Sequence, residues 1–139
     1  MYFITACTHN RARLLANAEI NDAFLHFCIA AKNRGIFVGR YVIMPDHLHL
    51  FAAFSLNSMG GLSEWTKSLK NSLSRTLRAN GIRAPHWQKG FFDHILRSEE
   101  SYSEKWAYVL LNPVRAGLVD DANDWPYQGE VHPLRLESL

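Results

Sequence analysis

Two kinds of hydrophobic spacing alternate along this chain of 139 residues. Short runs rich in β-branched and aromatic residues predict four strands, which lie at 2–8, 36–44, 47–54 and 91–97. Apolar residues that recur every three or four positions predict three helices, which lie at 18–34, 64–80 and 98–111. The middle helix has the clearest pattern, an apolar stripe of Trp65, Leu69, Leu73 and Leu77.

Turn and cap residues set the boundaries of these elements. Gly35 is expected to end the first helix, and the Pro45-Asp46 turn makes 36–54 a predicted hairpin. Ser98 is a good N-cap for the last helix, and Pro113 is expected to close it. The remaining tail, which contains Trp125-Pro126, shows no strong pattern and is predicted to be a loop.

The predicted element order is β-α-β-β-α-β-α within a single domain over 1–139. The first six elements have the order of a ferredoxin-like fold, in which an antiparallel sheet carries its helices on one face. The predicted class is therefore α+β, a ferredoxin-like sheet with an additional C-terminal helix.

Composition excludes several other classes of protein. With 47% hydrophobic and 20% charged residues, the chain is expected to form a packed core. The longest apolar runs are far too short to span a bilayer, and the first residues do not resemble a secretory signal. Cys7 and Cys28 form neither a disulfide framework nor a zinc-ribbon pattern, so we expect a reduced, cytoplasmic protein.

The net charge of +2 conceals an uneven distribution. Residues 1–97 hold 12 Lys and Arg against 5 Asp and Glu, whereas residues 98–139 hold 3 against 8, so the two parts carry +7 and −5. A basic body is compatible with a polyanionic partner such as nucleic acid, or simply with ordinary solvated surfaces.

Two histidines form the first candidate site. His47 and His49 are two positions apart on a predicted strand, so both imidazoles should lie on one face, roughly 7 Å apart along the strand. That arrangement suits two ligands of one metal ion. The alternative is a pair of partly buried histidines on a sheet face, and the spacing alone does not decide between them.

Tyr108 and Asn112 form the second candidate site, four residues apart at the end of the last helix. A phenol can attack a phosphodiester when a metal polarises the phosphate, and a carboxamide oxygen is a suitable ligand for Mg²⁺ or Mn²⁺. The alternative is a packing tyrosine followed by an asparagine that ends the helix.

A basic and aromatic stretch over 86–97 is the third candidate. Trp87 is suited to stacking on an unpaired base, and Lys89 and Arg97 to holding phosphates. The alternative is that the aromatic residues of this stretch are core residues. Asp93 and His94 are alternative hydrogen-bond partners for a metal ligand, and the sequence does not choose between them.

Three segments together resemble a known family. The segment 41–54 reads YVIMPDHLHLFAAF and resembles the strand-turn-strand of single-tyrosine HUH transposases. The segments 87–100 (WQKGFFDHILRSEE) and 108–119 (YVLLNPVRAGLV) resemble the REP-associated tyrosine transposase branch. The resemblance runs from about Tyr2 to Tyr127, and its motifs occur in the family's order.

The resemblance implies a metal-dependent single-strand DNA endonuclease and strand transferase that cuts beside hairpins. His47, His49 and Asn112 would hold Mg²⁺ or Mn²⁺, and Tyr108 would form a 5′-phosphotyrosine. The expected partner is single-stranded DNA with REP-like hairpins. The protein itself is expected to be a nucleoid-associated monomer or homodimer, with no membrane partner and no organic cofactor.

Several side chains are candidate DNA contacts beyond the catalytic residues. They are Arg11, Arg13, Lys67, Arg78, Trp87, Lys89, Arg97 and Arg115. Three other functions are alternatives: a module that binds a hairpin without cutting it, a metal-dependent nuclease that uses an activated water, and a structural domain with a basic face.

Overall fold

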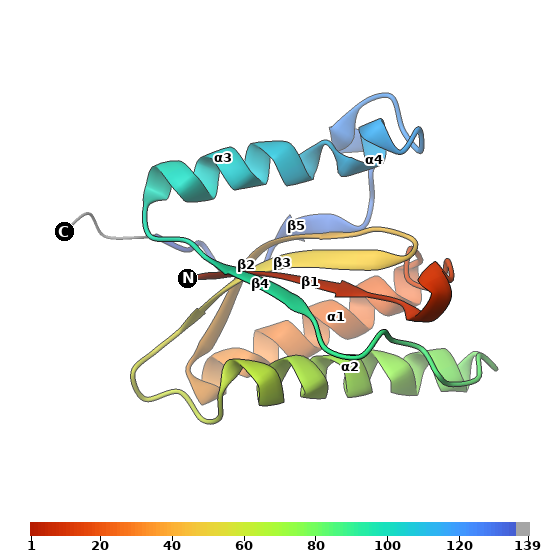
Figure 1. The fold of residues 1–139 in the computed structure, drawn as a ribbon, viewed down its shortest axis with the longest axis horizontal. Helices are drawn as coiled ribbons and strands as arrows, with labels where there is room; N and C mark the ends of the chain where they lie inside the picture. The colour runs from red at the N-terminus through yellow and green to blue at the C-terminus, as the bar shows by residue number, and fades with distance from the viewer. Residues whose placement is uncertain (136–139) are drawn as a thin grey trace.

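An antiparallel sheet in the order β4-β1-β3-β2-β5 runs through the middle of the computed structural model, which describes residues 1–135 (Figure 1). The strands are β1 (Tyr2–Cys7), β2 (Ile36–Ile43), β3 (His47–Phe54), β4 (Phe92–Ile95) and β5 (Gln128–Glu130). The helices are α1 (Ala18–Ala31), α2 (Leu62–Ala79), α3 (Glu99–Leu110) and the single turn α4 (Asn112–Arg115). None of the helices in the described residues is long and apolar enough to cross a membrane.

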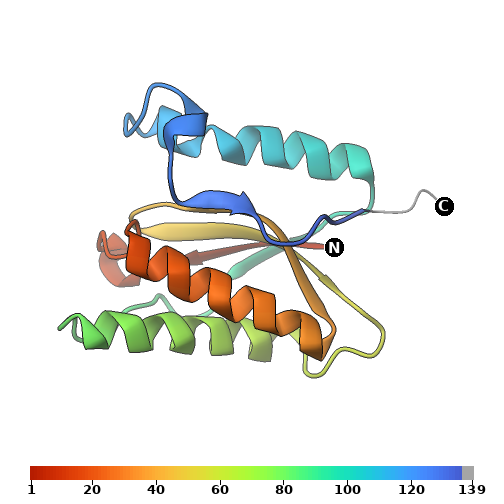
Figure 2. The same ribbon diagram turned by 180° about the vertical axis from the view of Figure 1, so that it is seen from behind.

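The predicted ferredoxin-like arrangement is confirmed. β1 and β2 both pair antiparallel with β3, so they run parallel to each other with β3 between them. In the same way, β1 lies between β3 and β4. The crossover helices α1 and α2 therefore cover one face of the sheet, and the additional helix α3 covers the opposite face (Figures 1 and 2).

Local chemistry explains where the helices begin. The Asn17 side chain accepts a hydrogen bond of 2.9 Å from the Ile20 backbone N–H at the start of α1, and Ser98 accepts one of 3.1 Å from Ser101 at the start of α3. These caps satisfy backbone donors that have no partner inside a helix. After α1, one 3₁₀ turn leads to Gly35, whose φ of +79° allows the chain to turn back into β2.

The alternating side chains of β3 divide between two apolar layers. Leu48 and Leu50 are buried on the α1/α2 face, where the predicted stripe of α2 packs against them. Phe51 points to the other face and belongs to a second cluster with Tyr102 and Val109 of α3. Since His47 and His49 share the parity of Phe51, they also lie on the α3 face.

The prediction of a structureless tail is wrong. The tail makes a 3₁₀ turn over Ala122–Asp124 and then β5, which pairs with 40–42 of β2. Trp125 lies between the 3₁₀ turn and β5 in the sequence, and its indole N–H donates to the Ile43 carbonyl at 3.0 Å. A strand of Gln-Gly-Glu has no β-forming side chains, so its conformation comes from the neighbouring strand rather than from its own sequence.

Candidate active site

The two histidines of the H-x-H pattern lie side by side at the start of β3. Their ring centroids are 4.8 Å apart. In the register of the sheet, Cys7 is opposite His47 and Thr5 is opposite His49. The sequence prediction that both imidazoles share one face is therefore confirmed, and that face is the one covered by α3.

Neighbouring side chains hold both rings in a defined orientation. The Nδ1 atom of His47 lies 2.8 Å from Oδ1 of Asp46, and Nδ1 of His49 lies 2.8 Å from Oγ1 of Thr5. Because a carboxylate only accepts, the Nδ1–H of His47 donates to Asp46. A ring fixed through one nitrogen in this way presents the other nitrogen as a metal ligand.

The charges around the pair keep Asp46 ionised. The Nε atom of Arg11 donates to Oδ2 of Asp46 at 2.9 Å. Partial burial opposes ionisation of this carboxylate, but the hydrogen bonds from Arg11 and His47 outweigh it and hold the pKa of Asp46 below its usual value. Arg11 therefore acts on His47 through Asp46 and also contacts it directly, since one of its terminal nitrogens lies 3.3 Å from Nδ1 of His47.

His49 is neutral at physiological pH. Burial, together with the positive charges of His47, Lys105, Arg115 and Arg11, lowers the pKa of His49 to about 3. A neutral imidazole has one free lone pair for a metal ion, and this lone pair is on Nε2 in the tautomer whose Nδ1–H donates to Thr5.

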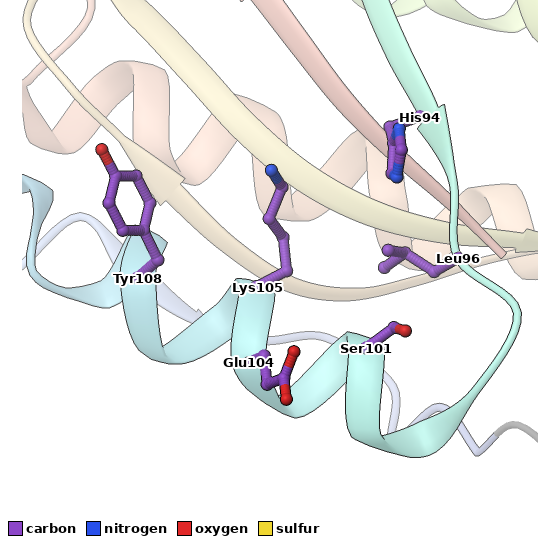
Figure 3. A pocket seen from close by; sticks show the side chains of 6 residues that line it. All are labelled: His94, Leu96, Ser101, Glu104, Lys105 and Tyr108. Carbon is purple, nitrogen blue, oxygen red and sulfur yellow. The ribbon is translucent and has the colours of Figure 1, made fainter.

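The helix α3 brings Tyr108 to the same face of the sheet. Tyr108 is 63% exposed and lines a cavity of about 410 Å³ with Lys105 and His94. Figure 3 shows Tyr108 and Lys105 rising from α3 toward the sheet while His94 reaches toward them from β4. The Lys105 ammonium lies 5.0 Å from the centre of the Phe3 ring, which stacks on His49 at 5.2 Å.

Arg115 of α4 joins the two residues of the Tyr-x-x-x-Asn pattern. Its guanidinium lies over the Tyr108 ring at 4.0 Å. One of its nitrogens donates to the Tyr108 carbonyl at 2.7 Å and to Oδ1 of Asn112 at 2.6 Å. Tyr108 and Asn112 are thus neighbours, as the spacing predicts, and a single cation holds both.

The donors present suit a mixed nitrogen and oxygen site. The described residues contain no group of three His, Cys, Asp or Glu side chains that could hold a metal. The amide oxygen of Asn112 accepts from Arg115 and has a second lone pair beside the one that Arg115 uses.

The predicted DNA contacts are distributed over several places. All seven basic candidates are exposed. Arg11 and Arg115 flank the histidines and Tyr108, whereas Lys67, Trp87 and Lys89 line a groove beside α2. The others are dispersed: Arg13 lines a cavity near Trp125, Arg78 lies in the last turn of α2, and Arg97 follows β4.

Sequence reasoning missed three residues of this site. The hydrogen-bond partners of the imidazoles are Asp46 and Thr5, and not Asp93 or His94 as the sequence predicts. Asp46 directly precedes the H-x-H pattern, so its proximity was available from the sequence, but Thr5 depends on the register between β1 and β3. Lys105 lies three residues before Tyr108, which places both on one side of a helix.

Comparisons with known proteins agree with this architecture. The family model described as "Transposase IS200 like" matches residues 1–108, a range that ends at Tyr108. A REP-associated tyrosine transposase of Escherichia coli K12 is 25% identical over 127 residues, which cover 91% of this chain and 73% of that protein.

A solved structure shows the same fold. It is the structure of a REP-associated tyrosine transposase bound to a REP hairpin, with a TM-score of 0.73 at 21% identity, and the match covers 99% of this chain and 90% of that one. The sequence resemblance is thereby confirmed: the chain belongs to the IS200-like transposase family, and REP-associated tyrosine transposases are among its relatives.

Proposed function

We propose that the chain is a metal-dependent single-strand DNA endonuclease and strand transferase that cuts beside hairpins through a covalent 5′-phosphotyrosine. The observation that carries this proposal is the pair of imidazoles whose Nδ1 atoms are occupied by Asp46 and Thr5. Their free nitrogens lie on the face of the sheet that α3 covers, and α3 carries the exposed phenol of Tyr108.

Tyr108 is the nucleophile of the proposed reaction. Its oxygen attacks the scissile phosphorus, the bond to the 3′ oxygen breaks, the phenol gives up its proton, and the leaving 3′ oxygen gains one. The product is a 5′-phosphotyrosine and a free 3′-OH. Because the phosphodiester energy is conserved in the covalent link, a second 3′-OH can reverse the reaction and transfer the strand.

Mg²⁺ or Mn²⁺ would be held by Nε2 of His47, Nε2 of His49 and the amide oxygen of Asn112. When bound, the ion supplies positive charge that stabilises the negative charge developing on the scissile phosphate. Asp46 and Thr5 keep the two rings oriented for it, and Arg115 keeps Asn112 beside Tyr108. The exposed guanidinium of Arg11 and the ammonium of Lys105 add positive charge where the phosphate enters.

The proposed substrate is single-stranded DNA that carries a REP-like hairpin. The solved relative is bound to such a hairpin, and the basic candidates of this chain are all exposed for phosphate contacts. The cut must lie in unpaired DNA, because in-line attack requires a backbone free to bend toward Tyr108.

A denaturing gel tests this function. End-labelled hairpins from the DNA beside the chain's own gene are mixed with the protein, with and without Mn²⁺, in parallel with Tyr108→Phe. We expect a protein-linked DNA band that requires the metal and is absent in the variant. Tyr102→Phe, which removes a buried phenol of the same helix, is the matched control and should retain the band.

The alternative functions give different results in the same experiment. Cleavage that persists in Tyr108→Phe without a linked product would indicate a nuclease that activates water. A retarded band on a native gel, with no cleavage by any hairpin in a broad pool, would indicate a binding module.

A further inference from the structure

A groove lies on the α2 side of the sheet, away from the face that carries the histidines. Its volume is about 480 Å³. One wall is a stripe of α2 side chains at helical spacing, which includes Lys67, Lys70 and Asn71. The other wall is the segment 87–91, which precedes β4 and lies beside α2 (Figure 1).

The lining of the groove combines aromatic surface with positive charge. Trp87 and Phe91 contribute half-buried rings, and three lysines surround them. Among the lining residues there is no Asp or Glu. Apolar rings with unneutralised ammonium groups are complementary to an unpaired nucleotide, whose base is flat and whose phosphates are anionic.

The groove is fixed in shape by hydrogen bonds that do not use its two outer lysines. The Lys70 ammonium donates to the Gln88 carbonyl at 3.1 Å and also to the Gly90 carbonyl. The Trp87 indole N–H donates to Ser74 Oγ at 3.0 Å and to the Lys70 carbonyl at 3.2 Å. Lys67 and Lys89 are exposed at the rim, where they can meet phosphates.

A short path around the edge of the sheet connects the groove with the proposed active site. Gln88 N–H donates to the Cys7 carbonyl at 2.9 Å, and Cys7 is opposite His47. Two strand spacings of about 4.8 Å therefore separate this segment from His47. Phe91 lines the groove, and His94 of β4 lines the Tyr108 cavity. These two residues are three positions apart along the edge of the sheet, which corresponds to about 10 Å.

We infer that this groove is a second DNA subsite, which receives an unstacked base of the single strand that continues past the cleavage position around the β4 edge. The inference rests on the proposed function for the presence of such a strand. Trp87 and Phe91 hold the base, and Lys67 and Lys89 hold its phosphates.

The test measures binding without cleavage, in the full chain with Tyr108→Phe. One DNA is a hairpin with a short oligothymidine flank, and the other is the same hairpin with a blunt end. Adding Lys67→Ala and Lys89→Ala should weaken binding of the flanked hairpin about tenfold and leave the blunt hairpin unchanged. The slope of log K against log salt should fall by about 1.4, since each single-strand phosphate contact contributes about 0.7.

The matched control removes the same charge at a distant place. Lys32→Ala with Arg34→Ala changes two exposed cations beyond the end of α1 and should leave both affinities unchanged. A third DNA, with abasic sites in the flank, tests the base pocket itself. It should bind about five- to a hundredfold more weakly than the thymidine flank, and this difference should shrink in the Lys67→Ala, Lys89→Ala variant.

Three results would overturn the inference. They are a loss of less than twofold in the groove variant, an equal loss in the Lys32→Ala, Arg34→Ala control, and equal binding of abasic and thymidine flanks. Failure of the proposed function is a separate result, because it would appear as a missing protein-linked DNA band when Tyr108 is intact.

Discussion

The two faces of the sheet use the same strand for opposite purposes. Toward α1 and α2, β3 presents Leu48 and Leu50, which are almost completely buried in an apolar layer. Toward α3, it presents His47 and His49, which are only partly covered. A strand whose side chains alternate can thus supply a core and a reactive site at once, without any change in its backbone.

The helix α3 itself has two different sides. Tyr102 and Val109 belong to an apolar cluster with Phe51. Tyr108 and Lys105, on another side of the helix, line a cavity together with His94 (Figure 3). The apolar side anchors the helix, so the other side can remain open to a substrate. The comparison predicts that stability and activity can be changed separately.

The largest expected effect is the loss of activity in His47→Ala. Removal of one proposed metal ligand should lower the rate of Mn²⁺-dependent cleavage by at least about 10³-fold, or about 4 kcal/mol of transition-state stabilisation. The free energy of unfolding should change by no more than about 1 kcal/mol, since His47 is on the rim and not in the core. Single-turnover cleavage and urea unfolding measure the two quantities. An active variant, or one that loses most of its stability, would contradict the division between the faces.

The opposite outcome is expected for Leu50→Ala on the α1/α2 face. Truncating this fully buried side chain should lower the free energy of unfolding by about 2–5 kcal/mol. The cleavage rate per folded molecule should remain near that of the original chain. Leu56→Ala is the matched control, because Leu56 is fully exposed in the loop after β3 and should change stability by less than about 0.5 kcal/mol. Equal effects of the two substitutions would show that this layer is not the main source of stability.

This contrast also explains why the sequence predicted some parts of the molecule better than others. The apolar layer was predictable because α2 and β3 each show their own period, as in the stripe that begins at Trp65. The pair His47 and His49 was predictable for the same reason, since a period of two places them together. Tyr108 and Asn112 were linked by the helical period across the end of α3.

What the sequence did not reveal depends on contacts between distant segments. Thr5 reaches His49 only because of the register between β1 and β3. Arg115 was expected to contact phosphate, and the structure places its guanidinium on Tyr108. The strand β5 forms because the edge of β2 accepts it, and no local pattern of Gln128 to Glu130 indicates a strand. Periodicity describes one element at a time and does not describe how elements pair.

The placement of Arg115 gives a prediction of intermediate size. If it positions Tyr108 and Asn112, Arg115→Ala should slow cleavage by about 10- to 100-fold, or about 1.4–2.7 kcal/mol, while the dissociation constant for the hairpin stays unchanged. Arg115→Lys should recover little, because an ammonium does not reproduce the planar guanidinium that both stacks on the ring and donates to two oxygens.

A direct phosphate contact by Arg115 would give a different pattern. The dissociation constant would then rise in Arg115→Ala, and the salt slope would fall by about 0.7. Anisotropy measurements at several salt concentrations, made beside single-turnover cleavage, distinguish positioning from phosphate binding. Lys32→Ala, beyond the end of α1, is a control that should leave the cleavage rate unchanged.

The smallest expected effect concerns Tyr41, which is buried on the α1/α2 face and donates to Oδ1 of Asn21 at 3.0 Å. Burial raises the pKa of Tyr41 from about 10 to about 12, with a further contribution from Cys28. The unfolded chain therefore loses this proton at a lower pH than the folded chain. The stabilising contribution is fully present below pH 10 and is lost as pH rises from 10 to 12, with a slope of up to about 1.4 kcal/mol per pH unit.

Urea unfolding between pH 10 and pH 12 should show a shallower decline in the free energy of unfolding for Tyr41→Phe than for the original chain. Identical slopes would mean that the α1/α2 face does not exclude the ionised phenol, and the contrast between a closed apolar face and an open reactive face would then need revision.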